Sequence, residues 1–242
     1  MEKIYIIITA GGSGLRMGSD LPKQFLNLNG VPVLFRTVHF FASLPAESQI
    51  FVVLPPLYVD YWNELATQYH FEVPCTVVSG GLTRFHSVKN ALQHIPPQGL
   101  VVVHDGVRPI LDQEMVMRCI ELTKTYQAVV PVVEITESMR KTEGSNSVPV
   151  DRSQYRLVQT PQVFHADVLI DAYNQSYLPS FTDDATVVER TGIPLFLTQG
   201  DVRNIKITTP QDLALAELLA PPFVHGGVSD PDLALDGLVE GD

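Results

Sequence analysis

Short apolar runs alternate along the chain with segments whose apolar residues recur at helical spacing. The apolar runs predict strands at residues 4–9, 50–54, 75–78, 100–104 and 128–133. The segments between them predict helices at residues 33–44, 59–69, 84–95 and 113–126. This alternation is typical of an α/β fold, so we expect a mostly parallel sheet with helices on both faces.

The alternation stops between Ile135 and Phe164, where the residues show no helical period. Extended pieces surround a polar turn at residues 143–147, which predicts a protruding β-hairpin arm over about residues 135–158. Beyond the arm we expect helices at residues 166–177 and 183–191, and strands at residues 195–198 and 204–208.

A last helix has a clear start signal in the sequence. Thr209 is placed to be its N-cap, Pro210 its first residue and Asp212 its third, a pattern similar to a capping box. After Ala220 the chain has Pro, Gly and acidic residues without a period, which predicts a flexible tail over residues 221–242. Residues 1–220 are then expected to form one domain.

Charge and composition narrow the possible partners. The formal net charge of −11 argues against general binding to nucleic acid or to an anionic membrane. No apolar run is long enough to cross a bilayer and the N-terminus lacks the build of a secretory signal, so we expect a cytoplasmic protein. Cys75 and Cys119 have no metal-type spacing and are interpreted as small buried side chains.

A glycine-rich loop follows the first predicted strand, at residues 10–18, and lets the backbone bring N–H groups close to an anion. It lacks the Gly-Lys-Ser/Thr ending of an ATPase phosphate loop. It also lacks the glycine spacing of a dinucleotide fold, which disfavours a dehydrogenase. Its distinguishing feature is the cationic residues that follow, Arg16 within the loop and Lys23 after Pro22.

Further polar residues lie where the third and fourth predicted strands end. Gly80 and Gly81 precede Arg84 and Ser87 at the start of a predicted helix, where backbone groups could read the edge of a flat base. Asp105 ends the fourth strand and is our predicted ligand for a hard cation such as Mg²⁺. The neighbouring His104 is interpreted as a structural residue, and Arg108 is left open between binding substrate and anchoring its loop.

Several of these motifs together carry a resemblance to a known family. Residues 10–18 read A-G-G-x-G-x-R-M-G and residues 22–25 read P-K-Q-F, which resembles the signature of the Rossmann-like sugar-phosphate nucleotidyltransferases. The motifs G-G-x-x-R-x-x-S at 80–87, H-D-x-V-R-P at 104–109, Q-T-P-Q at 159–162 and T-D-D-A at 182–185 extend it. They narrow the resemblance to the 2-C-methyl-D-erythritol 4-phosphate cytidylyltransferase family, over roughly residues 4–219.

The resemblance implies a Mg²⁺-dependent enzyme that transfers CMP from CTP to a sugar-alcohol phosphate, 2-C-methyl-D-erythritol 4-phosphate, and releases pyrophosphate in isoprenoid precursor synthesis. It implies catalytic roles for Arg16, Lys23 and Arg152. It implies nucleotide binding by Ala10, Gly11, Gly12, Gly14, Gly81, Arg84 and Ser87, and metal binding by Asp105. It implies acceptor binding by Arg108, Ser138, Arg152, Thr160, Thr182 and Lys206.

In that family the arm reaches into the site of a partner subunit, so the resemblance also implies a homodimer in which Arg152 acts across the interface. The chain departs from the family pattern at Leu82, where an acidic residue is common, and at Glu137 and Ser138, where Asp-Thr is common. Ser138 keeps the hydroxyl group of that threonine.

Two other functions remain open at this point. A cytidylyltransferase for ribitol 5-phosphate resembles the chain in the glycine loop, P-K-Q-F, H-D-x-V-R-P and Q-T-P-Q. Val150-Asp151-Arg152 and T-D-D-A favour methylerythritol phosphate over it. A catalytically inactive nucleotide-binding homologue predicts losses among the cationic and acidic residues, yet Arg16, Lys23, Asp105, Arg152 and Lys206 are all present.

Overall fold

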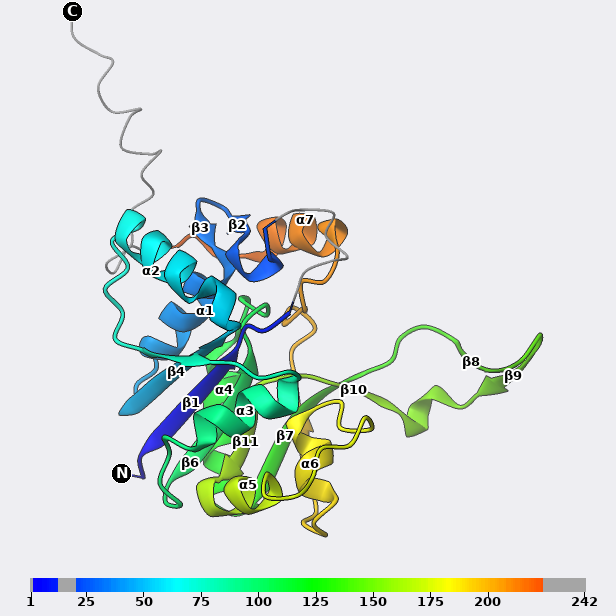
Figure 1. Cartoon of the computed structure of the whole chain (residues 1–242). Helices are drawn as coiled ribbons and strands as arrows, with labels where there is room; N and C mark the ends of the chain where they lie inside the picture. Colours follow the sequence, from blue (N-terminus) through cyan, green and yellow to red (C-terminus); the bar gives the residue numbers. More distant parts are fainter. Residues whose placement is uncertain (1, 13–20, 224–242) are drawn as a thin grey trace, which may run out of the picture.

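A computed structural model describes residues 2–12 and 21–223 of the chain. Its described part contains an eight-stranded sheet in the order β10-β7-β11-β6-β1-β4-β5, with β12 also paired to β7 (Figure 1). The pairs β1–β4, β1–β6, β4–β5 and β12–β7 are parallel, whereas β11 and β10 run antiparallel to their neighbours. The strands are β1 (Ile4–Thr9), β4 (Ser48–Leu54), β5 (Thr76–Ser79), β6 (Leu100–Asp105), β7 (Ala128–Glu134), β10 (Arg156–Val158), β11 (Gln162–His165) and β12 (Phe196–Gln199).

Helices cover both faces of this sheet, as the sequence predicts. Along β1, Ile4, Ile6 and Ile8 pack on one face and Tyr5 and Ile7 on the other, because successive strand residues point to opposite sides. The first face is covered by α1 (Val33–Ala42), α2 (Val59–Gln68) and α4 (Gln113–Thr123). The second face is covered by α3 (Arg84–Leu92), α5 (Ala166–Ala172) and α6 (Asp184–Glu189).

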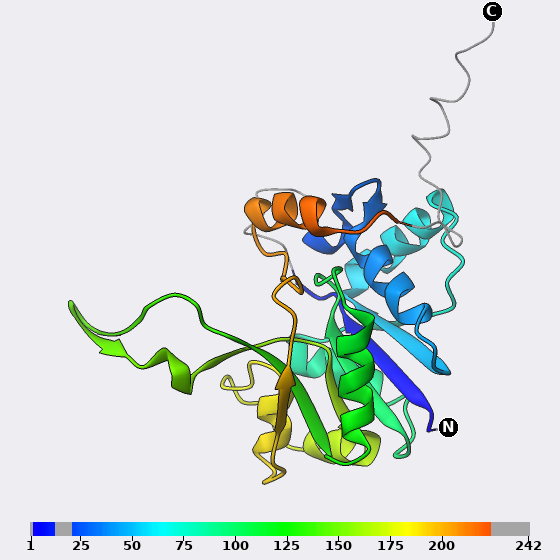
Figure 2. The same cartoon turned by 180° about the vertical axis from the view of Figure 1, so that it is seen from behind.

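The predicted arm is a two-stranded hairpin that projects away from the sheet (Figures 1 and 2). It consists of β8 (Met139–Glu143) and β9 (Asn146–Val150), joined by a turn in which Gly144 has φ +59°, a value that favours glycine. The arm ends earlier than predicted. Residues 156–158 form β10, which pairs with the end of β7 in the main sheet.

Two predicted elements near the C-terminus differ from the structure. Residues 204–208 are not a strand: the alternation of Ile205 and Ile207 reflects packing of an irregular segment into a small apolar cluster. The helix predicted over residues 166–177 ends at Ala172, whose carbonyl accepts a hydrogen bond from the Gln175 side chain.

The last helix, α7 (Pro210–Leu219), begins as predicted. Thr209 accepts a hydrogen bond from Asp212 N, and the Asp212 side chain accepts one from Thr209 N, a complete capping box. α7 packs beside the small hairpin of β2 (Asn27–Leu28) and β3 (Val31–Pro32). The first residues of the predicted tail are packed, since the Pro221 carbonyl accepts from Arg36; residues 224–242 lie outside the described part. Among the described helices, none has the length and apolar character needed to span a membrane.

Candidate active site

The candidate site lies at the carboxyl ends of the parallel strands. β1 lies between β4 and β6, and Thr9 is paired in register with Asp105. The chain runs from β1 to one side of the sheet through β4 and β5, and then crosses to the other side in β6. Ligands bind at such a reversal in open α/β sheets, because the loops that leave the neighbouring strands diverge and open a crevice.

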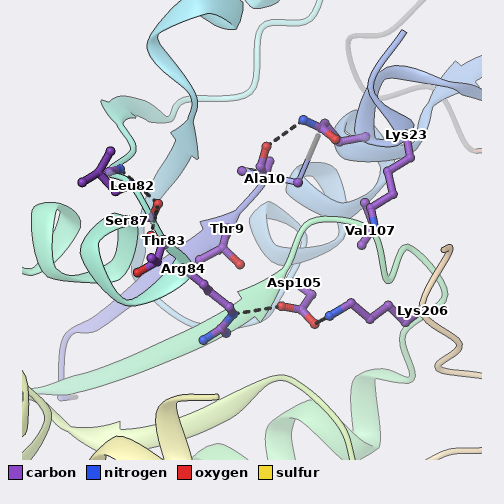
Figure 3. Close-up of a pocket in the computed structure, with 14 residues that line it drawn as sticks. Thr9, Ala10, Lys23, Leu82, Thr83, Arg84, Ser87, Asp105, Val107 and Lys206 are labelled. Atoms are coloured by element: carbon purple, nitrogen blue, oxygen red, sulfur yellow. Dashed lines mark hydrogen bonds and ion pairs between the residues drawn. The ribbon is translucent and has the colours of Figure 1, made fainter. Parts of the chain in front are cut away.

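The first loop of the site leaves β1 at Ala10. Ala10 N donates to Val53 O at 2.9 Å, which extends the sheet by one residue. Gln24 Nε2 donates to Ala10 O at 2.7 Å and ties the loop to the 3₁₀ turn at Lys23–Phe25 (Figure 3). Lys23 is 9 % exposed and passes close to Gly12, where an added Cβ would lie 3.4 Å from Lys23 Cε. Lys23 and the loop therefore line the same cavity.

The second loop of the site connects β5 to α3. Ser87 Oγ accepts from Gly81 N at 3.1 Å and donates to Thr83 O at 2.9 Å. Thr83 is the N-cap of α3 and accepts from His86 N. A Cβ on Gly81 would lie 2.4 Å from His86 Cβ, so the loop can close onto the helix only with glycine there. The Ser87 hydroxyl, predicted to bind nucleotide, shapes this loop in the structure.

Three cationic side chains surround Asp105. Lys206 Nζ lies 2.8 Å from Oδ2, Arg84 Nε 3.3 Å from Oδ1 and Arg108 Nε 3.5 Å from Oδ2. Arg84 and Lys206 reach the carboxylate from opposite sides (Figure 3). Burial alone would raise the pKa of Asp105, but the three cations outweigh it and hold the pKa well below its usual range. Asp105 is therefore ionised at neutral pH, within a cluster whose net charge is positive and suits phosphate groups.

Two cavities meet at this cluster. The first has a volume of about 260 Å³ and is lined by both loops; the second has about 320 Å³ and lies toward β11 and α6. Arg84, Asp105 and Lys206 line both cavities, so ligands in the two would be neighbours. The predicted residues on the first cavity are Ala10, Gly11, Gly12, Lys23, Gly81, Arg84, Ser87 and Asp105, and those on the second are Arg108, Thr160, Thr182 and Lys206.

Arg84 has one further partner, Asp184, which in turn binds Tyr173. Its Nη2 donates to Asp184 Oδ2 at 2.6 Å, and Tyr173 donates its hydroxyl to Asp184 Oδ1 at 2.6 Å. Burial alone would lower the pKa of Arg84, but Asp184 and Asp105 raise it well above its ordinary value. Burial and Asp184 likewise raise the pKa of Tyr173, so the hydroxyl stays a donor. The T-D-D-A motif contains Asp184, but nothing in the sequence links it to Tyr173.

His104 is a structural residue, as expected. It is fully buried, with Nδ1 3.0 Å from Thr160 Oγ1 and Nε2 3.1 Å from Arg108 O. Burial lowers the pKa of His104 to about 3, so the ring is neutral at physiological pH and cannot serve as a charged ligand-binding group. Thr160 Oγ1 accepts from Asp105 N at 3.1 Å, so this hydroxyl links His104 to the loop that carries Asp105.

Arg108 anchors its loop. Its Nη1 donates to Asn204 O at 2.7 Å, which joins the loop after β6 to the irregular segment that carries Lys206. Of the two roles left open by the sequence, the structure shows the anchoring contact, and it also places Arg108 on the wall of the second cavity.

The predicted residues of the arm are not brought to these cavities by their own chain. Ser138 and Arg152 are both exposed on the projecting arm, where Arg152 donates to Thr136 O. Neither lines either cavity. Arg16 and Gly14 lie outside the described residues.

Asp105 is the residue that we predicted as a ligand of a magnesium ion, and its surroundings test that prediction only for chemical fit. In the described part of the chain, no cluster of three or more His, Cys, Asp or Glu side chains could hold a metal by itself. Mg²⁺ often takes only one or two carboxylates and completes its coordination with water and substrate phosphates. The carboxylate of Asp105 lies at the junction of the two cavities and offers oxygen ligands of this kind, and an ion there would share them with Lys206 and Arg84.

Comparisons with known proteins agree with this architecture. A family model described as 2-C-methyl-D-erythritol 4-phosphate cytidylyltransferase matches residues 4–220. A protein of that name from Bacteroides thetaiotaomicron is 51 % identical over 214 residues, which is 88 % of this chain and 98 % of the relative.

Solved structures give the same result. The crystal structure of 2-C-methyl-D-erythritol 4-phosphate cytidylyltransferase from Francisella tularensis has a TM-score of 0.75 and 31 % identity, covering 90 % of this chain and 100 % of its own. The enzyme of the same name from Thermus thermophilus has a TM-score of 0.72 and 31 % identity, covering 91 % and 99 %. Because the family model matches residues 4–220 and the relative from Bacteroides thetaiotaomicron is 51 % identical over 88 % of the chain, this chain belongs to the 2-C-methyl-D-erythritol 4-phosphate cytidylyltransferase family.

Proposed function

We propose that this protein transfers CMP from CTP to 2-C-methyl-D-erythritol 4-phosphate and releases pyrophosphate. The observation that carries the proposal is the pair of cavities that share Arg84, Asp105 and Lys206. A nucleotide in the first cavity and an acceptor phosphate in the second would meet at these three side chains. The name that the relatives share identifies the acceptor and the transferred cytidylyl group.

The reaction needs positioning and charge stabilisation more than protein acid–base chemistry. A phosphate oxygen of the acceptor attacks the α-phosphorus of CTP, the bond to the β-phosphate oxygen breaks, and pyrophosphate leaves with that electron pair. The attacking oxygen is already anionic, so no general base is required. The neutral, fully engaged His104 is consistent with this, because it has no free nitrogen to accept a proton.

The described cations are placed to stabilise the charge of this reaction. Lys23 lies along the first loop, where the triphosphate would bind, and Lys206 lies between the two cavities. We assign Arg16 to the same task on the strength of its motif. Preorganised cations of this kind act most strongly in a cavity from which water is excluded.

Asp105 is our proposed ligand for Mg²⁺. When bound, the ion would neutralise negative charge on the nucleotide phosphates. Lys206 and Arg84 hold the carboxylate in place at the cavity junction.

We also propose that the protein acts in the cytoplasm as a homodimer joined through the arm. The arm and the strand that follows it expose several apolar side chains, which a partner subunit packed against them would bury. These side chains are Val148, Tyr155, Leu157 and Val158. In such a dimer Arg152 and Ser138 would complete the second cavity of the partner subunit, where an arginine fork suits the acceptor phosphate.

The test is pyrophosphate release from CTP and Mg²⁺ with two acceptors run in parallel. We expect turnover with 2-C-methyl-D-erythritol 4-phosphate and little with ribitol 5-phosphate. Turnover with ribitol 5-phosphate alone would show that ribitol 5-phosphate is the acceptor, while the reaction would still be cytidylyl transfer. No turnover with either, from protein that binds CTP, would favour the inactive homologue and contradict the proposal.

A further inference from the structure

A closed circuit of contacts joins Arg84 to three helices on one face of the sheet. Arg84 and Phe85 are consecutive residues at the start of α3. The Phe85 ring stacks on the Tyr173 ring at the end of α5, with centroids 4.7 Å apart and planes 19° apart. The Tyr173 hydroxyl donates to Asp184 at the start of α6, and Asp184 accepts from Arg84, which closes the circuit.

Each contact in the circuit restricts the next. The ring stack orients Tyr173, which is 2 % exposed, and so directs its hydroxyl. The hydroxyl occupies Asp184 Oδ1 and leaves Oδ2 facing Arg84. Asp184 is fully buried, so each of its two carboxylate oxygens needs a hydrogen-bond donor. If one donor is removed, the carboxylate can rotate or bind a water molecule in its place.

The orientation of Asp184 determines where the Arg84 guanidinium lies. Nη2 is held by Asp184 at 2.6 Å, whereas Nε is 3.3 Å from Asp105. The shorter contact, to Asp184, therefore holds Arg84 from outside the group of charges around Asp105, and the longer contact, to Asp105, lies within that group. The circuit therefore sets how Arg84 is presented where the two cavities meet.

We propose that Tyr173 is a positioning residue of the nucleotidyl-transfer site, acting through Asp184 on Arg84. The expected effect on turnover rests on the proposed function, whereas the expected effect on the position of Arg84 does not. Tyr173 touches neither cavity, so its effect on turnover passes through the arginine.

The test is Tyr173→Phe, which keeps the ring stack and removes only the hydroxyl. Tyr177→Phe is the matched control, because Tyr177 also contacts Phe85 but makes no hydrogen bond within the described residues. The first readout is hydrogen exchange of the Arg84 Nε–H group by NMR, assigned with Arg84→Lys. Arg36 Nε–H, which donates to Leu28 O on the other face of the sheet, is the internal reference. The second readout is kcat/KM for CTP.

We expect Tyr173→Phe to speed Arg84 exchange, to leave Arg36 exchange unchanged, and to lower kcat/KM about tenfold, less than the loss of a charge-stabilising group itself, because Arg84 is displaced and not removed. Tyr177→Phe should match the wild type in all three. Equal acceleration at both arginines would show general loosening and overturn the inference, as would wild-type turnover in Tyr173→Phe. If the wild type has no turnover with either acceptor, the proposed function fails, and the Arg84 signal alone then decides whether Tyr173 positions the arginine.

Discussion

At the scale of single residues, the site depends on a few charged groups whose surroundings set their properties. Lys23 is the clearest case, because it is almost buried and lies against the glycine loop. We expect Lys23→Ala to lower kcat about a hundredfold, equivalent to about 3 kcal/mol of lost charge stabilisation. The measurement is pyrophosphate release at saturating substrates. Lys124→Ala, at an exposed lysine directly after α4, is the control and should leave kcat unchanged. Near-normal turnover in Lys23→Ala would remove Lys23 from the mechanism.

His104 makes a second prediction at this scale, about pH. Burial holds the pKa of His104 at about 3 in the folded chain, against an ordinary value of 6.5. Between these values the unfolded chain binds one more proton, so stability is fully present above about pH 6.5 and falls as the pH drops toward 3. The slope is at most about 1.4 kcal/mol per pH unit.

Urea unfolding at pH 7, 6 and 5 measures this slope. We expect His104→Asn to flatten it, whatever that variant does to stability at pH 7. His70→Asn, at an exposed position with positive φ that asparagine tolerates, is the control and should keep the wild-type slope. If the free energy of unfolding of His104→Asn fell with pH as steeply as that of the wild type, other groups would cause the loss of stability at low pH.

At the scale of elements, the arm is separated from the site of its own chain. Its hairpin projects from the sheet (Figure 1), and Arg152, at the start of the 3₁₀ turn that follows β9, lines neither cavity. A role for Arg152 in the reaction therefore requires a second subunit, whose cavity the arm would reach.

Mixing two inactive variants tests that arrangement. Lys23→Ala and Arg152→Ala should each be nearly inactive alone. When both are co-expressed in equal amounts, half of the dimers are mixed, and one of the two sites in each is intact. We therefore expect about a quarter of wild-type activity to return. If Arg152 acted within its own chain, no site would be intact and activity would stay at the level of the variants.

At the scale of the whole molecule, the exposed apolar side chains of the arm and β10 predict that single chains associate. Light scattering at assay concentration should give about twice the 26.7 kDa mass of one chain. A variant that replaces Val148 and Leu157 by serine should shift toward the monomer and lose activity together with the dimer. A monomeric wild type that turns over normally would contradict both the dimer and the role of Arg152 in trans.

The sequence by itself determined the α/β architecture, most of the strands and helices, and the arm, and together with the family resemblance it pointed to part of the lining of both cavities. It could do so because these features are local: strand and helix periods, a capping box at Thr209, and short glycine or charged motifs at strand ends. The predicted secondary structure was wrong at a few segments whose conformation depends on tertiary packing. Residues 204–208 have a strand-like alternation but no partner strand beside them in the described structure, and residues 156–158 pair with β7 because of where the arm returns.

Only the tertiary structure decided which of these residues meet. It brought Arg84, Asp105 and Lys206 together from distant parts of the chain, and it revealed Tyr173 and Asp184 behind Arg84. It also showed that the Ser87 and Thr160 hydroxyls hold loops in place and that Ser138 and Arg152 line neither cavity of their own chain. Local patterns carry no information on such contacts, because side chains a hundred residues apart become neighbours only when the sheet and its helices have packed.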